Sequence, residues 1–408
     1  MSHPSSPSPA VPPASPGGLA PAAAAVTWPD AARHSAFDAW LAPLVGPHQL
    51  LPHTLRPASA DASFRRYLRI DSASGVSRIV MDAPPDKENC RPFVQVQGLL
   101  AAAGLHVPQI LAWDEAGGFM LLSDLGHQTL IELLDPARPQ DAYAWYQQAT
   151  DALLDWQKAS QPGVLPVYDE ALLRRELALF PDWYLGQHRG VTLDATQQAT
   201  LHSAFDAIVA HNLAAPSVYV HRDFMTRNLM APTLPAARGS LPPEGALAAL
   251  GRPGGGSMAP TPADGPLGVL DFQDAVYGPI TYDIASLLRD AFISWEEEFV
   301  IDITVRYWEK ARKAGLLGAN SASGWGNDFG EFYRSVEWMG LQRHLKVAGI
   351  FARLTLRDGK PKYLADTPRF MAYIGATANR YRQLGPLLKM LDEIEGTQPV
   401  VGFAYGRM

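Results

Sequence analysis

The sequence has a single cysteine, Cys90, among its 408 residues. One cysteine excludes an internal disulfide framework and any multi-cysteine zinc or iron–sulfur site, and it is typical of a reducing compartment. Basic residues are also few, 34 against 41 acidic residues, for a formal net charge of −7. A protein that mainly holds nucleic acid or an anionic membrane surface needs a basic patch, so this balance argues against both classes.

Long hydrophobic runs are missing as well. No stretch approaches about 18 uncharged apolar residues, so no segment is predicted to span a bilayer. The N-terminus has no Lys or Arg before Arg33 and therefore lacks the positive start of a secretory signal. The Gly-Lys pair at Gly359 and Lys360 is followed by Pro361, which excludes a phosphate-binding P-loop there. We therefore expect a cytoplasmic protein with neither a nucleic acid nor a membrane as partner.

Glycine and proline, 34 and 35 residues, are concentrated in two places. Residues 1–29 are mostly Pro, Ser and Ala, and 232–266 are rich in Pro and Gly. Such compositions bury too little surface to offset the entropy of ordering, so we expect a disordered tail and a flexible insertion. The rest divides into an N-terminal lobe, 30–125, and a C-terminal lobe, 126–408, which contains the insertion.

The two lobes differ in hydrophobic pattern. Short β-branched and aromatic runs separated by turn residues predict strands in the first lobe, with one helix that Pro92 opens and Gly104 closes. Apolar spacing of about 3.6 residues then predicts a mainly helical second lobe. The expected class is α+β, with a small antiparallel sheet, a helical lobe and a ligand cleft between them. The predicted strands are 63–70, 78–82, 107–113 and 119–122, and the predicted later helices are 140–158, 170–185, 195–213, 282–292, 296–314, 329–356 and 369–391.

One group of polar residues has the composition and spacing of a catalytic site. The apolar run at 218–220 leads into His221-Arg-Asp223, and Asn228 follows five residues after the aspartate. A second apolar run, 268–270, ends in Asp271. Phosphoryl transfer from ATP requires this set: one Asp takes the proton of the attacking hydroxyl, while an Asn and a second Asp hold Mg²⁺ on the phosphates. The alternative is that Asp223 and Asn228 are ordinary turn formers after a buried strand.

Several longer runs resemble the aminoglycoside-phosphotransferase family of small-molecule kinases, whose fold is the bilobal fold of protein kinases. More narrowly, they are similar to the bacterial anomeric sugar kinases of cell-wall recycling. The resemblance implies a monomeric enzyme that uses ATP and Mg²⁺ to phosphorylate N-acetylmuramate and N-acetylglucosamine at the anomeric hydroxyl, giving the 1-phosphate in peptidoglycan recycling. The runs are SFRRYLRI, MDAPPDKENCRPF, HRDFMTRNLM, GVLDFQDAVYGPITYDIASLLRDAF and LQRHLKVAGIFARL.

The resemblance also assigns roles to single residues. Asp223 becomes the catalytic base, and Asn228 and Asp271 become metal ligands. The phosphate-pairing Lys expected on the third strand is missing from 78–82, so a nearby arginine must meet the phosphate charge. The candidates for that charge are Arg65, Arg66 and Arg69. The nucleotide-binding residues implied are Ser63, Phe64, Arg65, Arg66, Ser123, Asp124 and Leu125.

The acceptor site is expected in the second lobe. A lactyl carboxylate on the sugar needs a cation or several N–H donors, and aromatic side chains can stack on a sugar face. The alternative for each candidate is a solvated helix face or ordinary aromatic packing. The candidate residues are Arg343, His344, Lys346, Trp183 and Tyr184.

Other readings stay open at this point. Asp328-Phe329-Gly330 looks like a kinase metal-binding triplet, but it opens a helix, so Asp328 is predicted to be an N-cap. Asp283 is expected either to cap a helix or to brace the catalytic loop. The acceptor could also be another small alcohol of the aminoglycoside, choline or homoserine type. From a different class, the missing Lys permits a nucleotide-binding pseudokinase scaffold.

Overall fold

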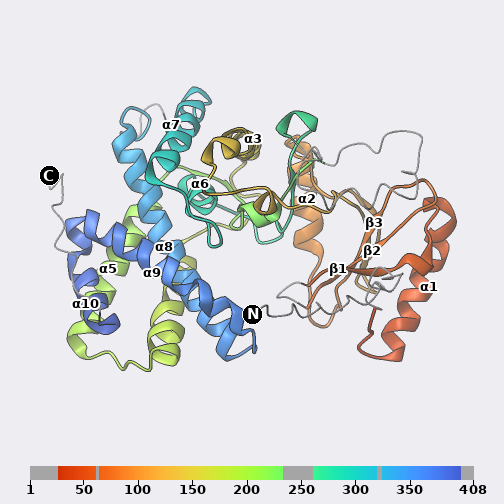
Figure 1. The fold of residues 1–408 in the computed structure, drawn as a ribbon, viewed down its shortest axis with the longest axis horizontal. Coiled ribbons are helices and arrows are strands. Elements are labelled where there is room, and N and C mark those ends of the chain that lie inside the picture. Colours follow the sequence, from red (N-terminus) through yellow and green to blue (C-terminus); the bar gives the residue numbers. More distant parts are fainter. Residues whose placement is uncertain (1–25, 61–63, 233–260, 319–323, 397–408) are drawn as a thin grey trace, which may run out of the picture. The chain divides into compact units, whose positions relative to one another are not determined.

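The computed structural model describes residues 26–60, 64–232, 261–318 and 324–396. They form two compact units, which are described separately (Figure 1). The first contains the described residues up to Asn89 together with Ile110–Asp124, and the second contains Cys90–Gln109 and the residues from Leu125 onward. The predicted tail lies almost wholly outside the described residues, as does most of the predicted insertion.

A five-stranded antiparallel sheet forms the first unit, in the order β1-β2-β3-β5-β4. Four of its strands were predicted, from short β-branched and aromatic runs separated by turn residues. β1 was not predicted, because Pro57 interrupts its pattern. A proline is tolerated there, since β1 is an edge strand and a missing N–H costs no central ladder bond. The strands are β1 (Arg56–Ala60), β2 (Arg66–Ile70), β3 (Arg78–Asp82), β4 (Ile110–Asp114) and β5 (Phe119–Ser123).

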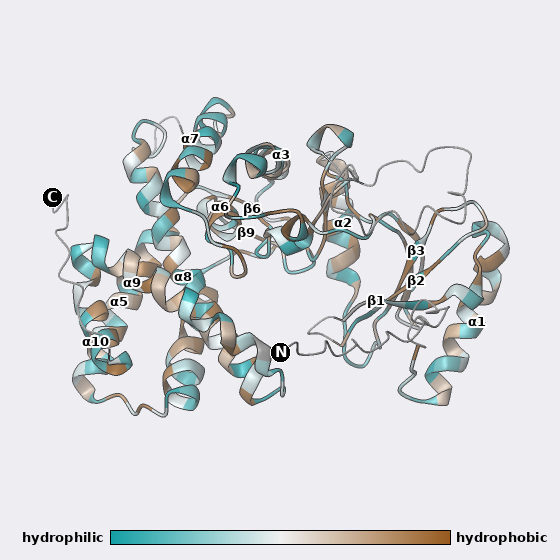
Figure 2. Ribbon diagram, viewed as in Figure 1, coloured by the Kyte–Doolittle hydropathy of each residue, from teal (hydrophilic) through white to brown (hydrophobic). Residues whose placement is uncertain are grey.

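The helix α1 (Ala31–His48) packs on this sheet and was also missed by the sequence reading, since prolines break its periodicity. The Asp30 side chain accepts from the Arg33 backbone N–H at 2.7 Å and caps its start. Phe37 and Leu41 lie one helical turn apart and are buried against strand residues such as Val80. Hydrophobic colour runs along β2 and β3 in Figure 2.

A buried ion-pair network ties α1 to the same sheet. Asp82, at the end of β3, has no exposed side-chain surface and receives two arginines. Arg33 of α1 donates from Nη2 to Asp82 Oδ1 at 2.6 Å, and Arg66 of β2 donates from Nε to Oδ2 at 2.9 Å. The Arg33 guanidinium also lies 3.8 Å above the Phe119 ring. Two cations therefore compensate one buried carboxylate.

The second unit is mainly helical, which confirms the predicted α+β class. Its strands are short pairs, β6 with β9 and β7 with β8, that flank the loops between helices. No helix in the described ranges is long and apolar enough to cross a membrane. The elements are α2 (Arg91–Ala102), α3 (Pro139–Lys158), α4 (Glu170–Leu179), α5 (Ala195–Leu213), β6 (Ser217–Val220), β7 (Leu229–Met230), β8 (Gly268–Val269), β9 (Val276–Pro279), α6 (Thr281–Leu288), α7 (Glu297–Lys313), α8 (Phe329–Leu356), α9 (Thr367–Arg380) and α10 (Gly385–Glu395).

The long helix α8 is the packing partner of α4, α5, α6, α7 and α9 (Figure 1). Gly349 permits its close approach to α4, because a Cβ there would lie 2.3 Å from the Leu179 carbonyl oxygen. The predicted helix 369–391 is instead two helices. Tyr381 is extended, and Pro386 stands in the first turn of α10, where its missing N–H costs nothing. The predicted helix 170–185 likewise changes at Phe180 into a π-helical segment, Phe180–His188.

Removing the charge of Asp82 should destabilise the first unit strongly. Breaking a buried ion pair from one side costs about 3–5 kcal/mol, so we expect Asp82→Asn to lower the free energy of unfolding by that order in urea titrations. The control is Asp71→Asn, because Asp71 pairs with Arg56 while its side chain is 41% exposed, and such pairs contribute about 1 kcal/mol or less. Equal losses in the two variants would contradict the assigned role of Asp82.

Candidate active site

The loop 221–228, which carries Asp223 and is the predicted catalytic loop, follows the buried strand β6. The strand pairs with β9, so Val220 ends at a fixed place in the sheet. His221 is buried and its Nδ1 accepts from the Asp223 backbone N–H at 3.3 Å. Burial lowers the pKa of His221 to about 4, so the ring is neutral and serves as an acceptor within the loop. The Asp223 side chain is only partly buried, which leaves its carboxylate accessible to a reactant.

Asp283 of α6 holds the start of this loop, and the predicted bracing role is confirmed. Its Oδ2 accepts from the His221 N–H at 2.7 Å, and its Oδ1 accepts from the Arg222 N–H at 3.0 Å. Every residue of α6 is buried. Burial raises the pKa of Asp283 to about 7, although the two N–H donors act in the opposite direction.

Asp290 holds the middle of the same loop. Its Oδ2 accepts from both the backbone N–H of Thr226, at 3.0 Å, and the Thr226 hydroxyl, at 2.7 Å. The other oxygen accepts from the Phe292 N–H at 2.9 Å. Burial raises the pKa of Asp290, and these donors oppose the increase. Two buried carboxylates thus fix the loop on either side of Asp223.

Asn228 and Asp271 lie side by side, because the pairing of β7 with β8 brings their strands together. Asn228 Nδ2 donates to the Asp223 carbonyl oxygen at 2.9 Å and to Asp271 Oδ2 at 3.3 Å. Gln273 Nε2 donates to Asp271 Oδ1 at 2.9 Å. Asp271 has a φ of 62°, a left-handed value that few side chains adopt. Asp223, Asn228 and Asp271 are therefore brought into one cluster, as their spacing predicts.

The donor set at this cluster fits Mg²⁺. The Asn228 amide uses its nitrogen for protein contacts, so its oxygen is left to face a cation beside the Asp271 carboxylate. Mg²⁺ prefers oxygen ligands and takes only one or two carboxylates, with phosphate oxygens and water completing its octahedron. Among the described residues, no group of three or more His, Cys, Asp or Glu side chains could hold a metal ion.

Asp328 has the structural role predicted for it. It is the N-cap of α8, and its Oδ1 accepts from the N–H groups of Gly330 at 2.7 Å and Glu331 at 3.3 Å. The Asp-Phe-Gly triplet is thus a helix start.

The predicted phosphate-turn residues lie in the first unit. Ser63 falls outside the described residues. The Phe64 backbone N–H donates to Glu88 Oε1 at 3.1 Å, and the Arg65 Nε lies 3.5 Å from Glu88 Oε2. The Phe64 side chain is 63% exposed, and the Lys87 ammonium lies 5.2 Å from its ring. Glu88 therefore holds both residues of this turn.

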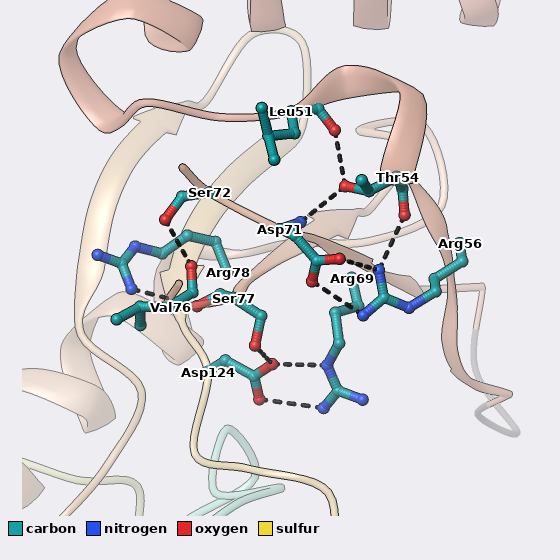
Figure 3. Close-up of polar contacts among 10 residues, drawn as sticks. All are labelled: Leu51, Thr54, Arg56, Arg69, Asp71, Ser72, Val76, Ser77, Arg78 and Asp124. Carbon is teal, nitrogen blue, oxygen red and sulfur yellow. Dashed lines mark hydrogen bonds and ion pairs between the residues drawn. The ribbon is translucent and has the colours of Figure 1, made fainter. Parts of the chain in front are cut away.

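The other two candidate arginines are also matched by acids of their own unit. Arg66 pairs with the buried Asp82, on the sheet face that α1 covers. Figure 3 shows Arg69 and Ser77 converging on the carboxylate of Asp124, at 2.5 Å from Arg69 Nε and 2.6 Å from Ser77 Oγ. Asp124, which directly follows β5, thus links Arg69 of β2 with the residue that precedes β3.

The other two predicted hinge residues fall in different units. Ser123 ends β5 in the first unit, and Leu125 is buried in the second. A Cβ on Gly268 would lie 2.8 Å from Leu125 Cδ1, so the glycine permits this packing three residues before Asp271.

Arg343 and His344, from the acceptor set, are buried in α8. The Arg343 guanidinium lies 5.1 Å from the Tyr282 ring centre. His344 Nε2 donates to the Arg289 carbonyl oxygen at 3.0 Å, and burial lowers the pKa of His344 to about 3, so the ring is neutral. His344 also lines a small cavity with Arg289 and Glu337. One lining residue, Arg289, directly precedes Asp290 in the sequence.

The remaining acceptor candidates have partners of their own. The Lys346 ammonium lies 2.9 Å from Glu176 Oε1. Tyr184 is buried, and its hydroxyl donates to Glu395 Oε1 at 3.0 Å. Trp183 is half-buried on the same segment. Within the described part of the chain, no hydrogen bond, ion pair or ring contact joins Trp183 or Tyr184 to the catalytic loop.

Sequence reasoning missed the residues that hold the loop from a distance. Asp290 is 64 positions from Thr226, and Glu176 is 46 positions from its partner Arg222. Neither belongs to a motif of fixed spacing. The one available signal was the position of Asp290 within an apolar run, which suggests burial. A buried carboxylate requires a partner.

The pKa of Asp283 predicts a stability effect with a definite sign. The pKa of Asp283 is 3.8 in the unfolded chain and about 7 in the folded protein. Between these two pH values the unfolded chain has released the proton that the folded protein keeps. The free energy of unfolding therefore falls as pH rises through this window, by roughly 1.4 kcal/mol per pH unit. Asp283→Asn removes the titration. In thermal unfolding at pH 5 and pH 7.5, the stability of the variant relative to that of the wild type should be higher at pH 7.5. The same difference in stability at both pH values would contradict this.

Three comparisons place the chain among known proteins. It is 45% identical over 372 residues to an N-acetylmuramate/N-acetylglucosamine kinase of Pseudomonas aeruginosa, covering 90% of this chain and 98% of that protein. It is 45% identical over 350 residues to one of Neisseria meningitidis serogroup B, covering 85% and 93%. The GDP complex of an aminoglycoside 2′-phosphotransferase variant matches the fold with a TM-score of 0.54 at 14% identity, covering 84% of this chain and 98% of that one.

The model of one protein family, described as the phosphotransferase enzyme family, matches residues 54–235 and 259–317. These ranges include the catalytic loop, Asn228 and Asp271, and most of the first unit. Together with the two relatives, the match shows that the chain belongs to the phosphotransferase enzyme family.

Proposed function

We propose that this protein is an ATP-dependent kinase that phosphorylates the anomeric hydroxyl of N-acetylmuramate and N-acetylglucosamine, in peptidoglycan recycling. The family implies ATP use, and the relatives named for these two sugars support the acceptor class. The observation that carries the proposal is the braced loop, which presents the accessible carboxylate of Asp223 beside Asn228 and Asp271.

Asp223 is the proposed base. Its carboxylate accepts the proton of the anomeric hydroxyl as the sugar oxygen attacks the γ-phosphorus of ATP. A new oxygen–phosphorus bond forms, the bond from the γ-phosphorus to the bridging oxygen breaks, and ADP leaves. Because little covalent chemistry is asked of the protein, holding Asp223 in place supplies most of its contribution.

Asn228 and Asp271 are the proposed ligands of Mg²⁺, which neutralises the phosphate charge when bound. In the first unit we propose the turn at Ser63 and Phe64, with the cation of Arg65, as phosphate contacts, and Ser123, Asp124 and Leu125 as the adenine-binding segment. Arg65 is favoured over Arg66 and Arg69 because it stands in the turn itself, next to Phe64, whereas the other two lie on β2.

Arg343 and His344 are the proposed acceptor contacts. The Arg343 Nε is buried without a hydrogen-bond partner among the described residues, a costly state that a ligand carboxylate would relieve. His344 donates from Nε2, so its Nδ1 has a lone pair for a sugar hydroxyl, and that atom also has no partner in the described ranges.

The reaction can be followed directly by ³¹P NMR of the purified protein with ATP, Mg²⁺ and N-acetylmuramate. We expect a new anomeric sugar-phosphate signal in the wild type and its loss in Asp223→Asn. The matched control is Asp328→Asn, which keeps a side chain that caps α8 well and should retain activity.

Other outcomes of the same experiment are informative. ADP formed without a sugar-phosphate signal would contradict the proposed acceptor and direct the search to another small alcohol. Nucleotide binding without turnover across a panel of acceptors would contradict catalysis and favour the pseudokinase reading. Full activity in Asp223→Asn would overturn the assignment of the base.

Arg343→Leu should separate the two sugars. A charge-assisted hydrogen bond contributes about 1.5–3 kcal/mol, so KM for N-acetylmuramate should rise at least tenfold while KM for N-acetylglucosamine, which has no lactyl carboxylate, changes little. Arg334→Leu is the control, because Arg334 also lies on α8 over an aromatic ring, 5.2 Å from the Tyr381 ring centre. Equal effects on both sugars would reject a carboxylate role.

A further inference from the structure

A buried carboxylate lies next to the catalytic loop but outside every motif used so far. Glu176 of α4 is 4% exposed and receives three donors. Tyr168 donates to one of its oxygens, and Arg222 and Lys346 both donate to the other, Lys346 at 2.9 Å. Lys346 Nζ also donates to the Tyr282 hydroxyl at 3.1 Å. The cluster therefore joins α4, α6 and α8 to the loop.

Arg222, the residue before Asp223, is the loop member of this cluster. Its φ is 76°, in the left-handed region that is unfavourable for a non-glycine residue. The backbone N–H is fixed by Asp283 at 3.0 Å, and the guanidinium is fixed by Glu176 and, at 3.4 Å, by the Asp274 carbonyl oxygen. A strained backbone persists only where its surroundings over-determine it, and Glu176 provides the strongest side-chain contact.

The charges of the cluster stabilise one another in their ionised forms. Burial acts to lower the pKa of Lys346, but nearby Tyr282, Glu176 and Asp223 more than offset this, so the pKa is raised and the ammonium stays charged. Burial acts in the other direction on Glu176, and there the two cations prevail and lower its pKa. The carboxylate therefore stays ionised and able to hold Arg222.

We propose that Glu176 and Lys346 are positioning residues, which hold Arg222 in its left-handed conformation and thereby place the Asp223 carboxylate for proton transfer. Only the kinetic test of this inference rests on the proposed function. The inference also replaces the acceptor role expected for Lys346, because two of the three donors of this ammonium are already directed at Glu176 and Tyr282.

The kinetic test uses Lys346→Met, Glu176→Gln and the conservative Lys346→Arg in the full chain. We expect the first two to lower kcat at least tenfold, equally for N-acetylmuramate and N-acetylglucosamine, with each KM within threefold of the wild type. Lys346→Arg should restore at least half of kcat, since it keeps the charge. Lys310→Met is the matched control, because Lys310 forms an exposed ion pair with Asp151 at 2.5 Å and should leave kcat unchanged.

A second measurement needs neither substrate. Hydrogen–deuterium exchange followed by mass spectrometry on a peptide covering 221–228 should be at least fivefold faster in Glu176→Gln and Lys346→Met than in the wild type, while peptides of the first unit stay unchanged. Unchanged exchange in peptides of α7, which belongs to the same unit as Glu176 and Lys346, also shows that this unit folds in the variants. Glu176→Gln is nearly isosteric and keeps the test available if Lys346→Met does not fold.

The outcomes separate the possibilities. A rise in KM for N-acetylmuramate alone in Lys346→Met would overturn the proposal in favour of an acceptor contact. Unchanged exchange at 221–228, or unchanged kcat in Glu176→Gln, would also overturn it. If the wild type phosphorylates neither sugar, the proposed function fails, and the exchange result still decides the positioning role.

Discussion

The catalytic loop needs hydrogen-bond partners that no regular secondary structure gives it. Residues 221–226 connect two strands and run through a buried region, so their backbone N–H groups would be left unpaired without dedicated acceptors. Asp283 supplies two acceptor oxygens to His221 and Arg222, and Asp290 supplies one to Thr226. Each is a carboxylate kept in a protein interior, where burial raises its pKa. The position of Asp223 depends on these two acids.

This requirement explains much of the helical packing around the loop. Asp283 can be held in place only if the helix that carries it is surrounded, and all residues of α6 are buried. The long helix α8 packs against α6 and also brings Lys346 to Glu176. Gly349 lets the backbone of α8 approach the end of α4. The same packing that forms the hydrophobic core thus sets the spacing among the charged residues beside Asp223.

Local patterns predicted the parts of this architecture that depend on local chemistry. The bounds of α8 follow from apolar periodicity and from the N-cap Asp328, and those of α5 follow from apolar periodicity alone. The cluster of Asp223, Asn228 and Asp271 follows from motif spacing. α1 was missed because Pro43 and Pro47 interrupt its pattern, although buried contacts through Phe37 and Leu41 stabilise it.

Contacts between distant positions could not be predicted in the same way. The bond from Glu176 to Arg222 joins two elements whose proximity depends on the whole fold. The ion pairs of the first unit are equally non-local, because Arg33 meets Asp82 across 49 positions. A charged residue in a sequence shows that a partner is needed if the residue is buried, and neither the burial nor the partner is visible from spacing alone.

The first unit applies the same compensation to an unusual strand. Where protein kinases have a lysine on the third strand for the phosphates, β3 here ends in Asp82, whose charge is opposite. That acid is neutralised by Arg33 and Arg66 on the face under α1, and Arg69 is held by Asp124. A buried acid at the end of β3 does not favour phosphate there, which directs attention to the turn before β2. Arg65 stands in the turn before β2, with Glu88 beside it, and is the arginine next to Phe64 in the proposed phosphate contact.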